Sequence, residues 1–108
     1  MYFYTPEERE SKVLFDGITA RTFWGDKILM SLVDLPANSV VPLHSHPHEQ
    51  TGMVLEGELT FTVGGETKTL GPGDMYVIPG DVEHKGVAGD APVKVLDVFS
   101  PVREDYKY

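Results

Sequence analysis

Short apolar segments separated by glycine and proline are the feature that most limits the folds open to this chain. The 108 residues include 11 glycines and 8 prolines, and the apolar runs between them have the length of strands rather than of helices. Helical spacing is expected only as a short turn within residues 6–12. The pattern predicts about nine short strands, which is typical of an all-β sandwich or barrel.

Turn residues divide the predicted strands from one another. Gly25-Asp26 has the composition of a hairpin turn, and Gly64-Gly65 is a strong signal for a two-residue hairpin. The sequence predicts strands at residues 21–24, 27–35, 40–46, 52–55, 58–63, 66–70, 75–78 and 93–99. No linker or repeat interrupts the pattern, so residues 1–108 are expected to form a single domain, with residues 103–108 as a tail or as a lid over the mouth of the barrel.

Charge and composition exclude several classes of function. Nine lysines and arginines stand against seventeen aspartates and glutamates, a formal net charge of −8, which argues against binding to nucleic acid or to an anionic membrane surface. The chain has no cysteine, so disulfides, thiolate metal sites and a cysteine nucleophile are excluded. No apolar run approaches the roughly 20 residues of a membrane span, and no signal peptide is expected, so the predicted location is the cytoplasm.

Three of the four histidines fall within five positions, at His44, His46 and His48. Alternate residues of a strand share a face, so His44 and His46 are expected to point the same way, and neutral imidazole is a common ligand of first-row metals. Pro47 bends the chain before His48, which is not expected to take part. The alternative is a polar surface loop that merely collects histidines.

Two further side chains can complete a metal site with His44 and His46. Gln50 follows four residues after His46, and its carbonyl oxygen can be a further ligand. His84 is the one distant histidine and lies beyond a turn and a strand, in a position to close a three-histidine site from a neighbouring strand. The residues therefore predict a divalent metal site within the β structure.

These residues lie in motifs that resemble those of the cupin superfamily. The pattern H-x-H-x3-Q-x6-G, which begins at His44, is similar to the first cupin motif with glutamine in the place of glutamate, and G-x5-P-x4-H, which begins at Gly73, is similar to the second. The second motif departs at Asp81, which stands where a glycine is usual, and at Ala88. Neither departure falls on a ligand position, and strand patterning extends the resemblance over nearly the whole chain.

The resemblance implies a small jelly-roll β-barrel that holds one divalent transition metal (Zn, Ni, Mn, Fe or Co) through His44, His46, Gln50 and His84. It also implies a homodimer, because cupins often pair through their N-terminal strands. Three neutral imidazoles and a neutral amide leave the charge of a dication uncompensated, which favours Lewis-acid action on an anionic substrate. The alternative is that Gln50 is a tolerated isostere of glutamate.

More narrowly, the segment from His44 and the closing LDVFSPVREDY resemble the uronate-linearising cupins of pectin and alginate breakdown (KdgF-type). In that family a metal and a C-terminal strand open cyclic 4,5-unsaturated uronates to the linear 4-deoxy-5-keto form. The matching residues here are Asp97, Phe99 and Arg103. The resemblance implies Asp97 and Phe99 as catalytic residues and Arg103 as a substrate-binding residue.

The residue pattern of the last predicted strand supports these roles. Period two puts Asp97 and Phe99 on one apolar face, so the Asp97 carboxyl is expected to be desolvated, which favours its neutral form and proton transfer near a metal. Arg103 would hold a uronate carboxylate with its fork of donors, and Phe99 would pack against the sugar ring. The alternative is an edge-strand aspartate that faces water and an arginine on a mobile tail.

The leading functional prediction is a metal-dependent enzyme of the isomerase or lyase kind that processes uronates, with a small anionic sugar or organic acid as its partner. Two alternatives stay open, because the cupin fold hosts many reactions. One is a metal-dependent dioxygenase that acts on a small organic substrate, and the other is a non-catalytic cupin that binds a metal and a sugar acid. Three aromatic residues are expected in the core or the pocket wall: Trp24, Phe61 and Tyr76.

Overall fold

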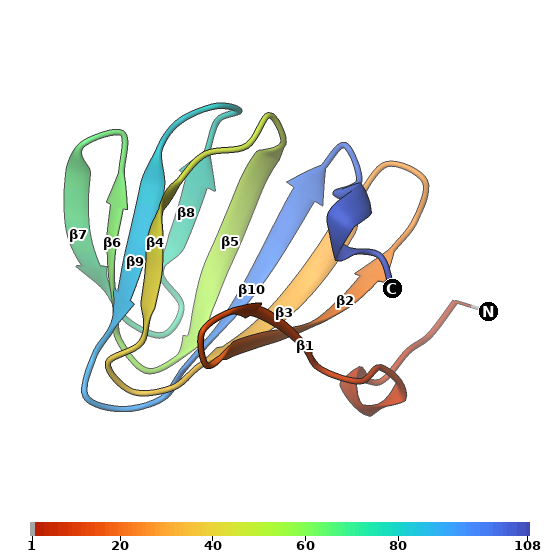
Figure 1. Cartoon of the computed structure of the whole chain (residues 1–108), viewed down its shortest axis with the longest axis horizontal. Coiled ribbons are helices and arrows are strands. Elements are labelled where there is room, and N and C mark those ends of the chain that lie inside the picture. The colour runs from red at the N-terminus through yellow and green to blue at the C-terminus, as the bar shows by residue number, and fades with distance from the viewer. Residues whose placement is uncertain (1) are drawn as a thin grey trace.

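The computed structural model describes residues 2–108. Within this range, ten strands form two antiparallel sheets that pack face to face (Figure 1). The strands are β1 (Lys12–Phe15), β2 (Ile18–Trp24), β3 (Leu29–Leu35), β4 (Val40–His44), β5 (Glu49–Glu56), β6 (Leu59–Val63), β7 (Glu66–Leu70), β8 (Met75–Ile78), β9 (His84–Ala88) and β10 (Val93–Ser100). Two short 3-10 helices are η1 (Pro6–Glu8) and η2 (Glu104–Tyr106). The prediction of an all-β jelly-roll sandwich is confirmed.

Strand order brings distant parts of the chain together. The larger sheet has the order β1-β2-β3-β10-β5-β8, and the smaller sheet has the order β4-β9-β6-β7. The strand β10 pairs with β3 on one side and with β5 on the other, so it is a central strand and not an edge strand. The alternative of an edge-strand aspartate is therefore wrong, and side chains from β3, β5 and β10 meet on the inner face of the larger sheet.

Local sequence rules account for two features that position the site. The residues of β10 alternate between buried and partly exposed, as period two requires, and Asp97 and Phe99 are on the buried face. Gly64 and Gly65 join β6 to β7 with φ angles of 55° and 85°, which is the left-handed conformation that a type I′ hairpin demands at both central residues. Both predictions are confirmed.

The structure corrects several predicted limits. The strand β4 ends at His44 instead of residue 46, β5 begins at Glu49 instead of residue 52, and β2 begins at Ile18 instead of residue 21. The turn expected at residues 25–26 is part of a longer loop, residues 25–28, closed by a hydrogen bond from Gly25 N–H to Ile28 O (2.9 Å). The strands β1 and β9 are additional to those predicted.

Buried apolar side chains fill the space between the sheets. The main cluster draws on both sheets and is formed by Ile18, Ala20, Val33, Leu35, Val54, Leu59, Phe61, Leu70, Ile78, Ala88, Val93 and Val95. A second cluster joins Leu29, Phe99 and Val102 with Trp24 and Tyr106, so that η2 packs across β3 and β10 (Figure 1). The expected aromatic residues Trp24 and Phe61 lie in these clusters. Among residues 2–108, no helix is long and apolar enough to cross a membrane.

Candidate metal centre and cavity

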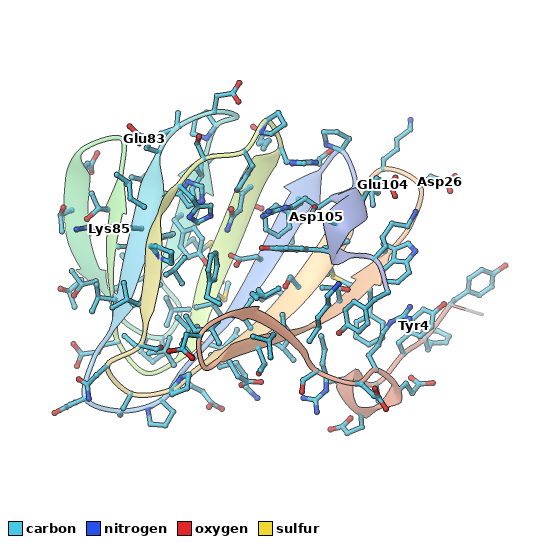
Figure 2. The ribbon with its side chains drawn as sticks, viewed as in Figure 1. Tyr4, Asp26, Glu83, Lys85, Glu104 and Asp105 are labelled. Carbon is cyan, nitrogen blue, oxygen red and sulfur yellow. The ribbon has the colours of Figure 1, made fainter. Side chains whose placement is uncertain are left out.

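Three imidazoles converge between the two sheets. His44 and His84 are directly paired across β4 and β9, and their ring centroids lie 4.3 Å apart. The His46 ring lies 4.9 Å from that of His84 and 5.8 Å from that of His44, and one ring nitrogen of each residue lies within 4.8 Å of the others. His84 is buried, whereas its neighbours Glu83 and Lys85, labelled in Figure 2, are exposed.

The His46 side chain reaches the cluster, but the prediction that strand alternation orients it is wrong. His46 lies beyond the end of β4, in a loop, so strand alternation does not orient it. A hydrogen bond from Asp81 N–H to His46 O (2.8 Å) holds this loop against the loop of the second motif. Gly80 allows the approach, since a Cβ there would lie 2.5 Å from Pro47 O. Asp81 itself has a φ of 66°, the left-handed conformation that explains why a glycine is usual at this position.

Backbone carbonyls fix the tautomer of all three rings. The Nδ1 of His44 lies 2.8 Å from Pro42 O, that of His46 lies 3.0 Å from His48 O, and that of His84 lies 2.9 Å from Val82 O. A carbonyl oxygen only accepts, so each Nδ1 carries the hydrogen and each Nε2 of a neutral ring keeps its lone pair. His48 thus contributes its backbone, and its own ring is outside the cluster, as expected.

Burial keeps two of these rings neutral. Desolvation lowers the pKa of His84 to about 4, and it also lowers the pKa of His46 below its ordinary value of 6.5. The nearby charge of Arg103 and the other imidazoles act in the same direction. Near neutral pH the rings of His46 and His84 are therefore uncharged and present unprotonated nitrogens, which is the form that binds a metal ion.

Two observations show that these residues fit a cation. The Nε2 of His84 is buried and has no hydrogen-bond partner within residues 2–108. The Nε2 of His46 lies 3.0 Å from the Oε1 of Gln50, so that two acceptors face each other with no proton between them. Hydrogen bonding from the Gln50 side chain also lowers the pKa of the Asp97 carboxyl, and only the NH2 group of an amide can donate to a carboxylate. An ion at this point would satisfy all of these lone pairs.

His44, His46 and His84, with the amide oxygen of Gln50, would therefore hold a divalent metal. A set of three nitrogens and one oxygen suits Zn, Ni, Co, Mn or Fe, and it does not suit Ca or Mg, which prefer oxygen ligands. The prediction that three histidines form a group that could hold a metal ion is confirmed. The assignment of Gln50 as a ligand stays a prediction.

A cavity of about 60 Å³ opens beside the imidazoles. Its walls are mainly apolar, and a few polar side chains reach it from the strands of both sheets: Ser31, His44, Gln50, Tyr76, His84 and Asp97. Arg103 and Tyr106 also line it. The three positions predicted for chemistry, Asp97, Phe99 and Arg103, thus face the same space as the metal cluster.

Asp97 is a buried carboxyl at the centre of the larger sheet. It is 8% exposed, and burial raises its pKa to about 6, partly offset by hydrogen bonds from Tyr76 and Gln50 and by the charge of Arg103. The Tyr76 hydroxyl donates to Asp97 Oδ1 over 2.5 Å. Burial raises the pKa of Tyr76 far above its ordinary value, so this hydroxyl remains a donor at every relevant pH.

Gly52 makes room for the contact between Tyr76 and Asp97. A Cβ at Gly52 would lie 2.5 Å from Asp97 Oδ1 and would overlap the Tyr76 ring. The sequence predicts Tyr76 only in the core or the pocket wall, and its contact with Asp97 is additional to that prediction. The available signal was Gly52 itself, because an isolated glycine inside a strand indicates close approach by another group.

Arg103 is held in place by aromatic rings. Its guanidinium carbon lies 3.9 Å from the ring centroid of Tyr106 and 5.1 Å from that of Phe99, and a side-chain nitrogen lies 3.4 Å from Asp105 Oδ2. The side chain is 12% exposed. In Figure 2, Glu104 and Asp105 mark η2 close to β10. Arg103 and Tyr106 thus line the cavity, and the Arg103 side chain packs against aromatic rings instead of extending into solvent.

The fold and site define the class of the protein. Residues 31–99 match the cupin domain family, and the chain belongs to that family. Two solved structures are similar over almost their whole length: KdgF from Halomonas sp. (28% identity, TM-score 0.91, 99% of each chain) and an RmlC-like cupin from Shewanella frigidimarina (27% identity, TM-score 0.92, 99% of this chain and 96% of that one). The predicted resemblance to the KdgF-type cupins is confirmed.

Two curated relatives share part of the chain. The dimethylsulfoniopropionate lyase DddQ of Ruegeria pomeroyi is 33% identical over 75 residues, which are 68% of this chain and 37% of the lyase. The L-ectoine synthase of Mycolicibacterium vanbaalenii is 38% identical over 69 residues, which are 62% of this chain and 52% of the synthase. The chain thus spans about half or less of the length of these relatives.

Proposed function

We propose that this chain is a metal-dependent cupin enzyme that opens cyclic 4,5-unsaturated uronates to the linear 4-deoxy-5-keto form. The observation that carries the proposal is the arrangement of three kinds of group around one cavity: the imidazole cluster, the buried carboxyl of Asp97 and the cation of Arg103. The likeness to KdgF over 99% of both chains supports it.

The reaction conserves the composition of the substrate. A proton leaves the anomeric hydroxyl, the bond between C1 and the ring oxygen breaks, and C1 becomes an aldehyde. The released enol takes a proton at C4 and becomes the ketone at C5. The two proton movements need a group that can both accept and donate a proton beside the sugar.

Asp97 is the group that we assign to these proton movements. It faces the cavity from a central strand, and the Tyr76 hydroxyl fixes the plane of its carboxyl through Oδ1. Arg103 would bind the uronate carboxylate, because its guanidinium is already oriented by Tyr106 and Phe99 and loses little freedom on binding. Phe99 would then lie against the sugar ring. A bound metal would supply polarisation of the substrate oxygens.

The test is turnover of a 4,5-unsaturated monouronate by metal-loaded protein. Loss of the ultraviolet absorbance of the enol ether is expected to be much faster than in buffer, and Asp97→Asn is expected to lower the rate by at least about 100-fold while its metal content stays that of the wild type. If the metal-loaded wild type is no faster than buffer, the proposal is wrong. Oxygen consumption with small organic substrates would instead favour the dioxygenase alternative.

A further inference from the structure

One buried hydroxyl in the cavity wall has no hydrogen-bond partner. Ser31, in the middle of β3, is 0% exposed, and its Oγ has no partner in the described part of the chain. The other residues on this face of β3 are Leu29, Val33 and Leu35, all apolar and buried. An unpaired hydroxyl among such residues lowers stability, so its presence needs an explanation.

Ser31 belongs to a row of polar side chains that crosses the larger sheet. The strand register pairs Thr22 with Ser31, Ser31 with Asp97, Asp97 with Gly52, and Gly52 with Tyr76. Two of the three hydroxyls in this row are satisfied by the protein: Thr22 donates to Tyr106 O over 2.5 Å, and Tyr76 donates to Asp97. The hydroxyl of Ser31 is the one that the described residues leave free.

Ser31 lies where its side chain could contact a ligand in the cavity. It lines the cavity together with Asp97, Gln50 and Tyr76, and it is the direct cross-strand neighbour of Asp97, the residue assigned to proton transfer. A serine hydroxyl can donate one hydrogen bond and accept another. It therefore matches a hydroxyl group of the ligand, which has the same two capacities.

We propose that Ser31 is a substrate-binding residue that pairs with a ring hydroxyl of the sugar acid beside Asp97. The inference rests on the proposed function for the identity of the sugar, and it adds a requirement for a hydroxylated ligand. A site that is built to pair with a hydroxyl discriminates strongly against ligands that lack it, because the buried partner is then left unsatisfied.

The test compares Ser31→Ala with Ser39→Ala in the metal-loaded full chain. Ser39 is a matched control, because its hydroxyl donates to Pro36 O over 2.7 Å in an exposed loop away from the cavity. Ser31→Ala is expected to raise KM for a 4,5-unsaturated galacturonate about tenfold, the loss that follows from one missing hydrogen bond, with kcat changed less than about threefold. Its metal content and melting temperature are expected to equal or exceed those of the wild type.

A second measurement separates this inference from the proposed function. Saturated D-galacturonate is expected to raise the melting temperature of the wild type and of Ser39→Ala, and to raise that of Ser31→Ala by much less, whether or not the unsaturated sugar is turned over. Equal shifts in all three proteins, or no shift in the wild type, overturn the assignment of Ser31. A marked loss of stability in Ser31→Ala with unchanged ligand shifts also overturns it, because the hydroxyl would then be structural.

Discussion

At the scale of single residues, the amide at position 50 lies between two hydrogen-bond acceptors, the Nε2 of His46 and the carboxyl of Asp97. Its oxygen faces the unprotonated Nε2 of His46, and its NH2 group supports the carboxyl of Asp97. A glutamate in place of Gln50 would put a second carboxylate against Asp97, and two like charges at close range cannot both ionise readily. The position of Asp97 is thus a local reason for an amide at this site, beside the charge of the metal, and the alternative of a tolerated isostere stays open.

Removal of His84 is predicted to weaken metal binding. His84→Ala deletes the buried nitrogen that has no hydrogen-bond partner among residues 2–108, so the affinity for a divalent transition metal is expected to fall by more than about tenfold. His48→Ala is the matched control, because His48 contacts the cluster through its carbonyl group, which alanine retains. Elemental analysis and metal titration measure both variants. Intact uptake in His84→Ala would falsify the site.

The Asp97 carboxyl gives a predicted dependence of stability on pH. Burial raises its pKa from the ordinary 3.8 to about 6 in the folded protein, so its stabilising contribution is fully present below the unfolded value and is lost as pH rises through about 6. Asp97→Asn does not titrate, and its stability relative to the wild type is expected to rise by on the order of 2 kcal/mol between about pH 4.5 and about pH 7.5.

The measurement is urea unfolding of both metal-free proteins at the two pH values. The histidines of the cluster titrate in both proteins, so the difference between the two curves isolates the carboxyl. A difference that does not change with pH would mean that the Asp97 carboxyl is solvated in the folded protein, contrary to its position in the sheet.

At the scale of strands, turn residues predict elements better than burial does. The strands β6 and β7 follow from the Gly64-Gly65 hairpin, although β7 is mostly exposed, and β8 follows from its apolar residues after the turn at residues 71–74. The strand β9 escapes prediction because its buried residues are His84, Gly86 and Ala88, whereas Val87 is exposed, which inverts the usual pattern. The three histidines that converge could be predicted because two of them are close in sequence and His84 is the one histidine outside that cluster. The contacts of Ser31 and Tyr76 with Asp97 depend on the register of four strands, which sequence pattern does not determine.

Gly52 in β5 is predicted to be required for the hydrogen bond between Tyr76 and Asp97. Gly52→Ala would push its Cβ into Tyr76 and Asp97, at an expected cost of about 1–3 kcal/mol in the free energy of unfolding and a clear loss of turnover. Gly25→Ala is the control, because no atom lies within 4 Å of a Cβ there, and its effect is expected to stay within about 0.5 kcal/mol. Similar unfolding curves for the two variants would contradict this account.

At the scale of the whole molecule, the homodimer stays a prediction, and an exposed aromatic segment at the N-terminal end is compatible with it. Tyr2 and Phe3 are almost fully exposed, and together with Tyr4 they line a surface groove with Phe23 and Met30 of the larger sheet. Such aromatic groups are enriched at the centres of interfaces. The molar mass in solution is the measurement that decides the oligomeric state.

Hydrogen bonds join the last residue of the chain to residues 9–10 and to β2. The Tyr108 hydroxyl lies 2.6 Å from Glu10 O and 3.0 Å from Ala20 O, to which it donates, and the Arg9 guanidinium donates to Tyr108 O over 3.1 Å. Thr22 in β2 anchors the same segment through Tyr106 O. Since this segment carries Arg103, the contacts that hold residues 104–108 also determine where the cation lies.

Loss of one hydroxyl from this anchor is predicted to affect stability and substrate binding together. Tyr108→Phe removes hydrogen bonding worth about 1 kcal/mol, so the melting temperature is expected to fall by about 5 °C, and KM for the uronate is expected to rise more than kcat falls because Arg103 is less well positioned. Tyr2→Phe is the control, because Tyr2 is 93% exposed. A Tyr108→Phe variant with the wild-type melting temperature and KM would show that Arg103 is oriented by Phe99 and Tyr106 alone.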